Sequence, residues 1–190
     1  MKRPITLAGF EATFAGNPDP WNTFAAADER RKRDAIVHAL GAERLGRVIE
    51  LASGNGSNTL SLARRALRLD ATDGAPRAVD LTRKLVAGLP RVEVRRLALP
   101  ARFPHVRYDA IVAAEILYYL SPRDLAAVAV EVGRRLRTGG RLVLAHSHIR
   151  FADAAQSPAD VHDRFVAGLP VRRVHRVRTE RWRVEAYVRS

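Results

Sequence analysis

Short apolar runs alternate with helix-like segments between residues 47 and 145 of the chain. A buried parallel strand is short and almost continuously apolar, whereas an amphipathic helix repeats its apolar residues every three or four positions. By this pattern, strands are expected at residues 47–51, 69–72, 92–97, 108–114 and 141–145. Helices are expected between them, at residues 58–69, 76–88 and from Ser121-Pro122 to just before Gly139-Gly140. Such alternation predicts right-handed crossovers and a doubly wound α/β sheet.

The N-terminal part of the chain follows a different pattern. Residues 1–22 read as irregular, because the prolines of the Pro-Asp-Pro turn exclude a helix there. Thr23 or Asp28 is expected to cap a helix that runs to about Leu40. The first 40 residues therefore predict an irregular arm followed by one helix.

The pattern of the C-terminal part predicts a helix and two further strands, which extend the sheet. A helix is expected from Ser157-Pro158 to about Gly168. Residues 171–177 and 182–188 then alternate apolar and polar side chains, which predicts an antiparallel hairpin with its arginines facing outward. With the five earlier strands, the hairpin makes a mostly parallel sheet of seven strands in a single domain of residues 1–190.

The composition is that of an ordinary folded domain. Hydrophobic residues make up 47% of the 190 residues, which is enough for one core. Cysteine is absent, which excludes disulfides, thiolate zinc sites and a cysteine nucleophile. No apolar segment follows the N-terminal Lys2-Arg3, and no run reaches the roughly 20 apolar residues of a membrane span, so a cytoplasmic protein is expected.

The net charge is +13, which would favour anionic partners. The basic residues are scattered along the chain, however, and aromatic residues rarely lie among them. A nucleic-acid groove usually gathers both kinds of residue. The distribution therefore favours solvated basic faces, and a small-molecule partner over a nucleic acid.

The first predicted strand leads into a glycine-containing turn, Glu50-Leu51-Ala52-Ser53-Gly54-Asn55-Gly56. Glycines at such a turn let a ligand approach the backbone closely. Asp73 ends the next strand about 20 residues on, where doubly wound folds place the acid that binds ribose hydroxyls. A dinucleotide site is disfavoured, because Thr59 stands where its third glycine is expected. The turn and the acid indicate a ligand with a ribose.

Four segments resemble, in the same order, the motifs of the class I methyltransferases that use S-adenosylmethionine (SAM). They are Glu50 to Gly56, Asp73-Gly74-Ala75-Pro76, Tyr108 to Leu120 and Leu136 to Leu144. The resemblance implies SAM as cofactor and S-adenosylhomocysteine (SAH) as product. The cofactor-binding residues that it implies are Glu50, Ala52, Gly54, Gly56, Asp73, Gly74 and Glu115. Ala52 replaces the family's first glycine, which is tolerable if its φ is negative.

A narrower resemblance, to the nodulation N-methyltransferase (NodS-like) family, spans nearly the whole chain. It is carried by Phe10-Glu11, Asn17 to Trp21, Glu29 to Lys32, Glu115 to Leu120, His146 and Asp160 to Asp163. It implies that residues 1–40 cover the cofactor, that Trp21 and Lys32 bind it, and that the acceptor is an amine such as an amino sugar. Two departures stand out: Asp28 replaces a tyrosine, and Leu97-Ala98-Leu99 lacks the acid that contacts adenine.

The residues after strands four and five are the candidates for catalysis, because open α/β sheets bind ligands at the carboxyl ends of their strands. Methyl transfer requires an aligned nucleophile and, for an amine, a proton acceptor. Glu115 is the first choice as base or substrate anchor, followed by His146, with Tyr118 as a wall of the site. His162 is expected to be structural, and the spacing of the histidines and aspartates fits no metal site.

Two other functions stay open. An RNA methyltransferase would account for the charge of +13, although the residues after strand four lack the Asn/Asp-Pro-Pro-Tyr motif typical of base-amine methylation. A degenerate, non-catalytic SAM-fold binding protein would account for Ala52 and for the missing acid at Leu97 to Leu99. A nicotinamide-dependent oxidoreductase is disfavoured by the incomplete glycine pattern.

Overall fold

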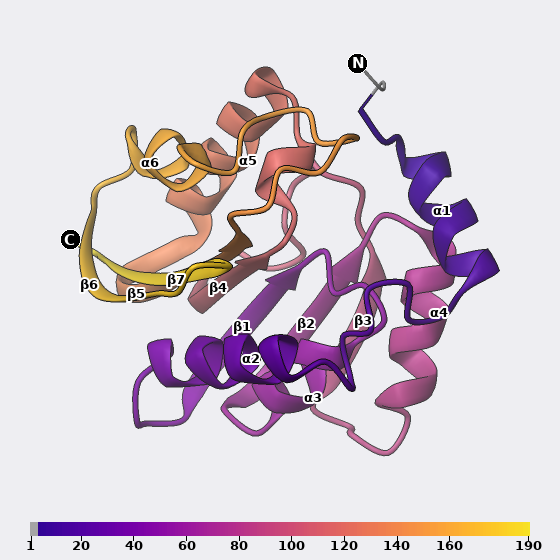
Figure 1. Ribbon diagram of the computed structural model, residues 1–190. Helices are drawn as coiled ribbons and strands as arrows, with labels where there is room; N and C mark the ends of the chain where they lie inside the picture. The colour runs from indigo at the N-terminus through magenta and orange to yellow at the C-terminus, as the bar shows by residue number, and fades with distance from the viewer. Residues whose placement is uncertain (1–3) are drawn as a thin grey trace.

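A seven-stranded sheet runs through the centre of the computed structural model, which describes residues 4–190 (Figure 1). The strands are β1 (Leu45–Leu51), β2 (Ala66–Asp73), β3 (Val92–Arg96), β4 (Tyr108–Ala114), β5 (Leu136–Ser147), β6 (Val171–Arg178) and β7 (Trp182–Arg189). Their order across the sheet is β3-β2-β1-β4-β5-β7-β6. The first five in this order are parallel, and β7 is antiparallel to both β5 and β6. The predicted mostly parallel sheet with a C-terminal antiparallel hairpin is confirmed.

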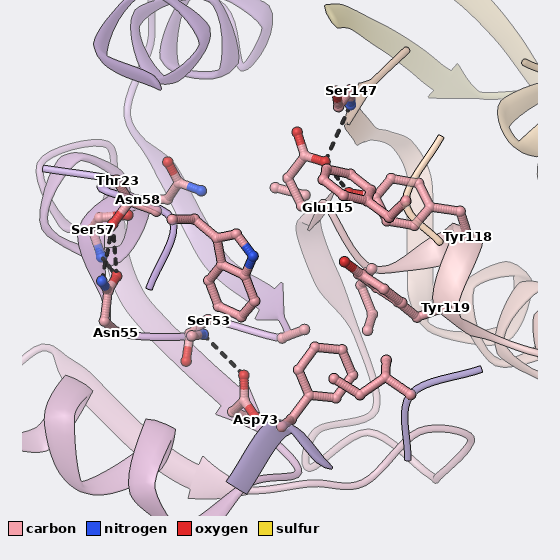
Figure 2. A pocket seen from close by; sticks show the side chains of 18 of the residues that line it. Thr23, Ser53, Asn55, Ser57, Asn58, Asp73, Glu115, Tyr118, Tyr119 and Ser147 are labelled. Carbon is pink, nitrogen blue, oxygen red and sulfur yellow. Dashed lines mark hydrogen bonds between the residues drawn. The ribbon is translucent and has the colours of Figure 1, made fainter. Parts of the chain in front are cut away.

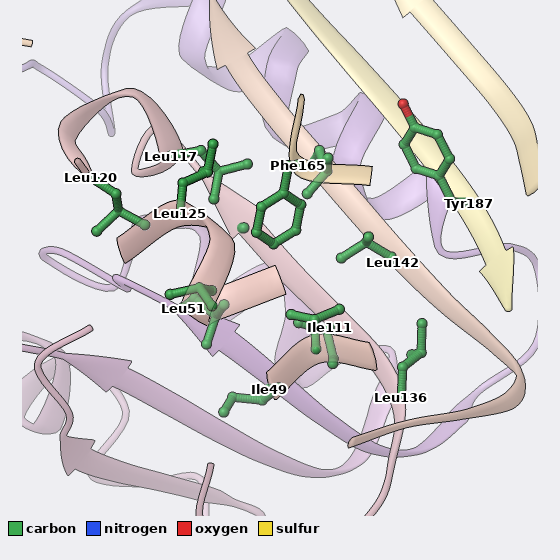
Figure 3. Close-up of a cluster of buried hydrophobic side chains, with 14 of the residues drawn as sticks. Ile49, Leu51, Ile111, Leu117, Leu120, Leu125, Leu136, Leu142, Phe165 and Tyr187 are labelled. Atoms are coloured by element: carbon green, nitrogen blue, oxygen red, sulfur yellow. The ribbon is translucent and has the colours of Figure 1, made fainter. Parts of the chain in front are cut away.

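Helices cover both faces of this sheet (Figure 1). They are α1 (Leu7–Gly16), α2 (Ala27–Ala39), α3 (Ser57–Ala63), α4 (Pro76–Leu85), α5 (Pro122–Arg135) and α6 (Val161–Val166), with a 3₁₀ turn, η1 (Leu117–Tyr119). On one face, Ile36 of α2 and Leu62 of α3 pack with Val112. On the other, Leu125 of α5 and Phe165 of α6 pack over the sheet (Figure 3). No helix within residues 4–190 has the length and apolarity needed to span a membrane.

The direction in which the chain winds reverses at β1. From β1 the chain passes through α3 to β2 and then β3 on one side, and it returns to β4 and β5 on the other. The carboxyl ends of β1, β2 and β4 therefore meet at one edge of the sheet, and the loops that leave them lead to opposite sides. Ligands of open α/β sheets bind in the crevice at such a reversal.

The structure corrects the expectation for the N-terminal arm. Residues 7–16 of the stretch expected to be irregular form α1, and Met1 to Arg3 lie outside the described residues. Thr6 caps this helix, because its Oγ1 accepts a hydrogen bond from the Gly9 N–H at 3.2 Å. Phe10 and Phe14 lie on successive turns and pack beside the start of α4. The prolines exclude a helix only from residue 18 onward, so they do not prevent this earlier one.

Two predicted helix ends were also wrong. Neither Thr23 nor Asp28 caps α2, which begins without a side-chain cap. α3 ends at Ala63 rather than near Leu69, because the chain from Ala66 onward pairs with β1 as a strand. Pairing with the neighbouring strand overrides the helical spacing of the apolar residues in that segment.

The C-terminal elements differ from expectation mainly in length. β5 begins at Leu136 and continues to Ser147, which makes it longer than predicted, whereas α6 is shorter. The arginines of β6 are exposed, as expected. In β7, by contrast, Arg183 is 5% exposed and donates to the carbonyl oxygen of Ala159 at 3.0 Å.

Replacing Ser121 with alanine is expected to lower the free energy of unfolding by about 1 kcal/mol. At the N-terminus of α5, Ser121 Oγ accepts a hydrogen bond from the Asp124 N–H at 3.1 Å, and alanine removes this acceptor. Urea unfolding followed by circular dichroism measures the change. Ser121→Thr keeps the hydroxyl and serves as the control. Equal losses in the two variants would contradict the capping role.

Candidate functional site

A cavity of about 550 Å³ opens at the carboxyl ends of the parallel strands (Figure 2). Small-molecule sites typically have volumes of roughly 300–1,000 Å³. The lining comes from α1, the turn before α2, α2 itself and the loops that follow β1 to β6. The cofactor residues expected from the sequence that lie in this lining are Trp21, Lys32, Ala52, Gly54, Asp73, Gly74 and Glu115.

The loop after β1 has three residues with left-handed backbone conformations. The φ angles are 56° at Ala52, 58° at Gly54 and 85° at Gly56. Glycine adopts such angles freely, whereas they cost about 1–2 kcal/mol in a residue with a Cβ. The condition under which an alanine would be tolerated here without strain, a negative φ, is therefore not met. Strained residues concentrate at functional sites, and this one lines the cavity.

Asp73 ends β2 and joins the two loops beside it. Its Oδ2 accepts a hydrogen bond from the Gly54 N–H and its Oδ1 accepts one from the Ala75 N–H, each at 2.9 Å. Burial raises the pKa of this carboxyl, although the two N–H donors act to lower it. Each carboxylate oxygen has a further lone pair, so Asp73 can still accept hydrogen bonds from ligand hydroxyls.

Glu50 and Gly56 do not line the cavity; they support the loop from behind. Glu50 is 1% exposed, and its Oε2 accepts a hydrogen bond from Thr59 Oγ1 at 2.6 Å. Burial raises the pKa of Glu50 to about 8. Gly56 packs against α4, where a Cβ would lie 3.0 Å from Leu85. Glu50 and Gly56 therefore support the loop on its side away from the cavity.

Glu115 is held from three sides inside the cavity. Its φ is 54°, a left-handed conformation directly after β4. Lys32 Nζ and Tyr118 Oη donate to its two carboxylate oxygens, and the Ser147 N–H donates to Oε2 at 3.1 Å (Figure 2). Lys32 also donates to Glu29 at 2.8 Å. The structure thus brings Lys32 of α2 to Glu115 and Tyr118, both of which follow β4.

Lys32 and Tyr118 donate to Glu115, and their pKa values keep both side chains protonated near neutral pH. Burial acts to lower the pKa of Lys32, but the carboxylates of Glu115 and Glu29 outweigh it and raise the pKa. Burial and the charge of Glu115 raise the pKa of Tyr118 well above its usual value. Lys32 therefore stays charged, and the Tyr118 hydroxyl stays a donor.

The N-terminal arm forms an aromatic wall of the cavity. The ring of Phe10 lies 5.0 Å from that of Tyr119, and the ring of Phe14 lies 5.4 Å from that of Trp21. The Ile5 N–H donates to a carbonyl oxygen in the loop after β5 at 2.9 Å. α1 therefore joins the region around α4 to the loops after β4 and β5.

His146 does not lie where a catalytic base is needed. It is 0% exposed and absent from the cavity lining. Its Nε2 accepts the N–H groups of Ile116 and Leu117, and its Nδ1 lies 2.8 Å from His162 Nε2. The expectation that His146 acts on the acceptor is not supported, because both ring nitrogens are occupied in the interior. His162 is 0% exposed and paired, as expected of a structural histidine.

Sequence reasoning missed the contacts that tie the N-terminal turn to the loop after β1. Asn55 Nδ2 donates to Thr23 Oγ1 at 2.9 Å (Figure 2). It also donates to Asp19 Oδ1 at 2.9 Å. Asn55 lies between the two glycines of the loop, and Asp19 lies between two prolines. Both turns were visible in the sequence, but nothing there indicated that they pair.

The two departures from the NodS-like pattern both lie at the cavity. Asp28 forms an ion pair with Arg181 of the β6–β7 turn, whose Nε lies 2.9 Å from Oδ2. An arginine distant in the sequence therefore accompanies the acid that replaces tyrosine. Leu97, Ala98 and Leu99 also line the cavity, so the wall after β3 is apolar.

Replacing Glu50 with glutamine is expected to flatten the pH dependence of stability between about pH 4.5 and 8. The folded-state pKa of about 8 lies above the ordinary 4.5, so the folded state keeps a proton that the unfolded state releases. Stability conferred by this group is therefore present below pH 4.5 and is lost as the pH rises through this window. At about 1.4 kcal/mol per pKa unit, the effect reaches a few kcal/mol.

Thermal unfolding at a series of pH values measures this slope. Glu93→Gln, on the exposed side of β3, is the control and should keep the wild-type slope. An unchanged slope in Glu50→Gln would show that the buried carboxyl does not titrate in this way.

Comparison with known proteins agrees with this fold. Residues 48–140 match the family described as a methyltransferase domain. Nodulation protein S of Rhizobium tropici is 31% identical over 140 residues, which cover 66% of this chain and 53% of that protein. Nodulation protein S of Sinorhizobium fredii is 30% identical over 120 residues, or 60% of this chain and 52% of that protein. The chain thus spans about half the length of these relatives.

Solved structures show the same architecture over most of the chain. The N-methyltransferase NodS from Bradyrhizobium japonicum, in complex with SAH, aligns with a TM-score of 0.85 at 21% identity, covering 96% of this chain and 97% of that one. A putative methyltransferase from Pseudomonas syringae aligns with a TM-score of 0.76 at 27% identity, covering 86% of this chain and 100% of that one. Residues 48–140 of this chain therefore form a class I SAM-dependent methyltransferase domain, and the chain is NodS-like.

Proposed function

We propose that this protein transfers a methyl group from SAM to the nitrogen of a small-molecule amine, such as an amino sugar, and releases SAH. The observation that carries the proposal is an acidic cavity in a basic chain. Among the residues that the structure describes, five acidic and two basic side chains line the cavity, although the net charge is +13. The acids are Asp28, Glu29, Asp73, Glu115 and Asp124, and the bases are Lys32 and Arg181. Such a lining favours a cationic acceptor.

The half of the cavity formed by the loops after β1, β2 and β3 suits SAM. Asp73 keeps lone pairs for the ribose hydroxyls, and Leu97 to Leu99 offer apolar surface to the adenine. Gly54 has no side chain, and a Cβ there would occupy space 3.6 Å from Phe14. Lys32 is a buried cation suited to the carboxylate of SAM. The relation to a NodS structure in complex with SAH supports this assignment.

The acceptor half contains the group to which we assign proton removal. When bound, SAM supplies a methyl carbon activated by its sulfonium sulfur. An amine is protonated near neutral pH and must lose a proton before its lone pair can attack. The Glu115 carboxylate accepts that proton at an oxygen whose position is set by Lys32, Tyr118 and Ser147. Tyr118, with its raised pKa, acts as a donor that holds Glu115.

The aromatic wall suits the same acceptor. Tyr119 lies between Phe10 and Phe151, with ring centroids 5.0 Å and 6.3 Å away, and all three line the cavity. An ammonium group over an aromatic face is stabilised by roughly 0.5–2 kcal/mol. Phe10 of α1 contributes part of this wall, which supports the covering role inferred for the N-terminal segment.

The acidic lining argues against one of the two alternative functions and leaves the other to a measurement of turnover. A polyanion such as RNA would meet like charge at the cavity, so it is disfavoured as acceptor. A binding protein without activity differs from an enzyme only in turnover. Tight SAM binding with no methylation of any amine would favour that alternative.

Replacing Asp73 with asparagine is expected to weaken SAM and SAH binding by about 10- to 100-fold, or 1.4–2.7 kcal/mol. The neutral amide cannot accept hydrogen bonds at both atoms as the carboxylate does. Isothermal titration calorimetry measures the affinity. Asp80→Asn, an exposed residue of α4, is the control and should bind like the wild type. Undiminished affinity in Asp73→Asn would remove the ribose assignment.

Replacing Glu115 with glutamine is expected to lower kcat by roughly 10²- to 10⁴-fold while SAH affinity changes much less. Glutamine keeps the shape of the side chain but cannot take a proton from the amine. Turnover is measured as SAH release with an amino sugar and with its N-acetylated counterpart, whose nitrogen is not basic. Glu93→Gln is the control. Equal turnover of the two sugars, or full activity of Glu115→Gln, would contradict amine methylation with this base.

A further inference from the structure

Three buried titratable side chains form a hydrogen-bonded row behind the turn that carries Glu115. His146 of β5, His162 of α6 and Glu185 of β7 are each 0% exposed. His146 Nδ1 lies 2.8 Å from His162 Nε2, and His162 Nδ1 lies 2.7 Å from Glu185 Oε2. None of the three lines the cavity. Burying such groups is costly unless each is paired, so the row requires an explanation beyond packing.

The contacts of the row assign the protons along it. His146 Nε2 faces the N–H groups of Ile116 and Leu117 at 3.3 and 3.1 Å, so it carries no proton and acts as an acceptor. The proton of His146 is therefore on Nδ1 and is donated to His162 Nε2. His162 in turn holds its proton on Nδ1 and donates it to Glu185. Both imidazoles are neutral, and every ring nitrogen has a partner.

Glu185, at the end of the row away from Glu115, is held ionised. Glu185 also accepts from Tyr187 Oη at 2.8 Å and from Arg173 at 3.3 Å, and Arg176 lies 3.4 Å away. Burial alone would raise the pKa of Glu185, but the hydrogen bonds from His162 and Tyr187 lower it to about 2. A fixed carboxylate thus sets which nitrogen of each histidine carries the proton.

The near end of the row meets a strained segment. Glu115 has a φ of 54°, which a non-glycine residue adopts only when its surroundings impose it. The next two N–H groups, those of Ile116 and Leu117, begin η1, and no earlier residue of a helix accepts them. His146 supplies one acceptor for both. The turn that aims Glu115 and Tyr118 into the cavity is therefore fastened through its backbone.

We propose that Glu185, His162 and His146 form a positioning row that sets the backbone of residues 115–117 and thereby the catalytic orientation of Glu115. The row acts through main-chain N–H groups. It passes no proton to Glu115, because the only free lone pair of His146 faces those two donors. The proposal extends the proposed function, since it concerns the carboxylate to which that function assigns proton removal.

The row works only while both imidazoles are neutral. A second proton on His162, at Nε2, would face the Nδ1–H of His146. If the His146 proton moved to Nε2 instead, that N–H would point at the N–H groups of Ile116 and Leu117. Burial lowers the pKa of both histidines. The charged and titratable groups around them are Lys32 of α2, Arg183, Glu185 and Tyr187 of β7, Asp163 of α6, Tyr118 of η1, and Arg173 and Arg176 of β6.

His162→Phe tests the proposal, because it keeps the ring in the core but removes both hydrogen bonds. We expect the ¹H–¹⁵N resonances of Ile116 and Leu117 to shift, and kcat to fall roughly 10- to 100-fold, with SAH affinity and the KM for the amine nearly unchanged. His162→Gln can still accept and donate, and it should restore part of kcat. His38→Gln, at an exposed position of α2, is the control.

The resonances separate this proposal from the proposed function. If no amine is methylated by the wild type, the proposed function fails, but the shifts at Ile116 and Leu117 still test the row. Unshifted resonances in a folded His162→Phe variant would overturn the positioning role. A second result would also overturn it. In that case His162→Gln would lose as much activity as His162→Phe, and a lowered melting temperature would account for the loss in both.

Discussion

The reversal of strand order at β1 is the constraint on which the site depends. Because β2 and β4 flank β1 and their following loops lead to opposite sides, the sheet edge cannot be closed by its own connections. The N-terminal arm packs against this opening with Phe10, Phe14 and Trp21. The cavity is therefore a product of topology first, and side chains then decide its chemistry.

Backbone strain lies where the cavity is built. Ala52 and Glu115 line it with φ angles of 56° and 54°, and Asn22 follows Trp21 with 52°. Two of these residues adjoin a hydrogen bond between elements: the Ser53 N–H, next to Ala52, donates to the Thr72 carbonyl oxygen, and the Glu115 N–H donates to that of Ala145. The rigid sheet supplies the acceptors, so the loops keep conformations that they would not hold alone.

Charge is divided between the surface and the site. The arginines that give the chain its +13 lie mostly on exposed faces such as β6, whereas acids dominate the cavity. Inside the cavity, Lys32 is paired with Glu29 and Glu115, and Asp28 is paired with Arg181. A cation entering the cavity meets carboxylates that the protein has already fixed in place, which limits reorganisation during reaction.

The sequence alone determined the alternation of strands and helices, the terminal hairpin and the loop with Gly54 and Asp73, because periodicity and turn residues are local properties. It could not determine that α3 stops at Ala63, that Ala52 has a positive φ, or that His146 is buried beside His162. Those outcomes depend on contacts between residues far apart in the chain. Tertiary packing alone decided which polar residues face the cavity, because it sets the distances over which charges and hydrogen bonds act.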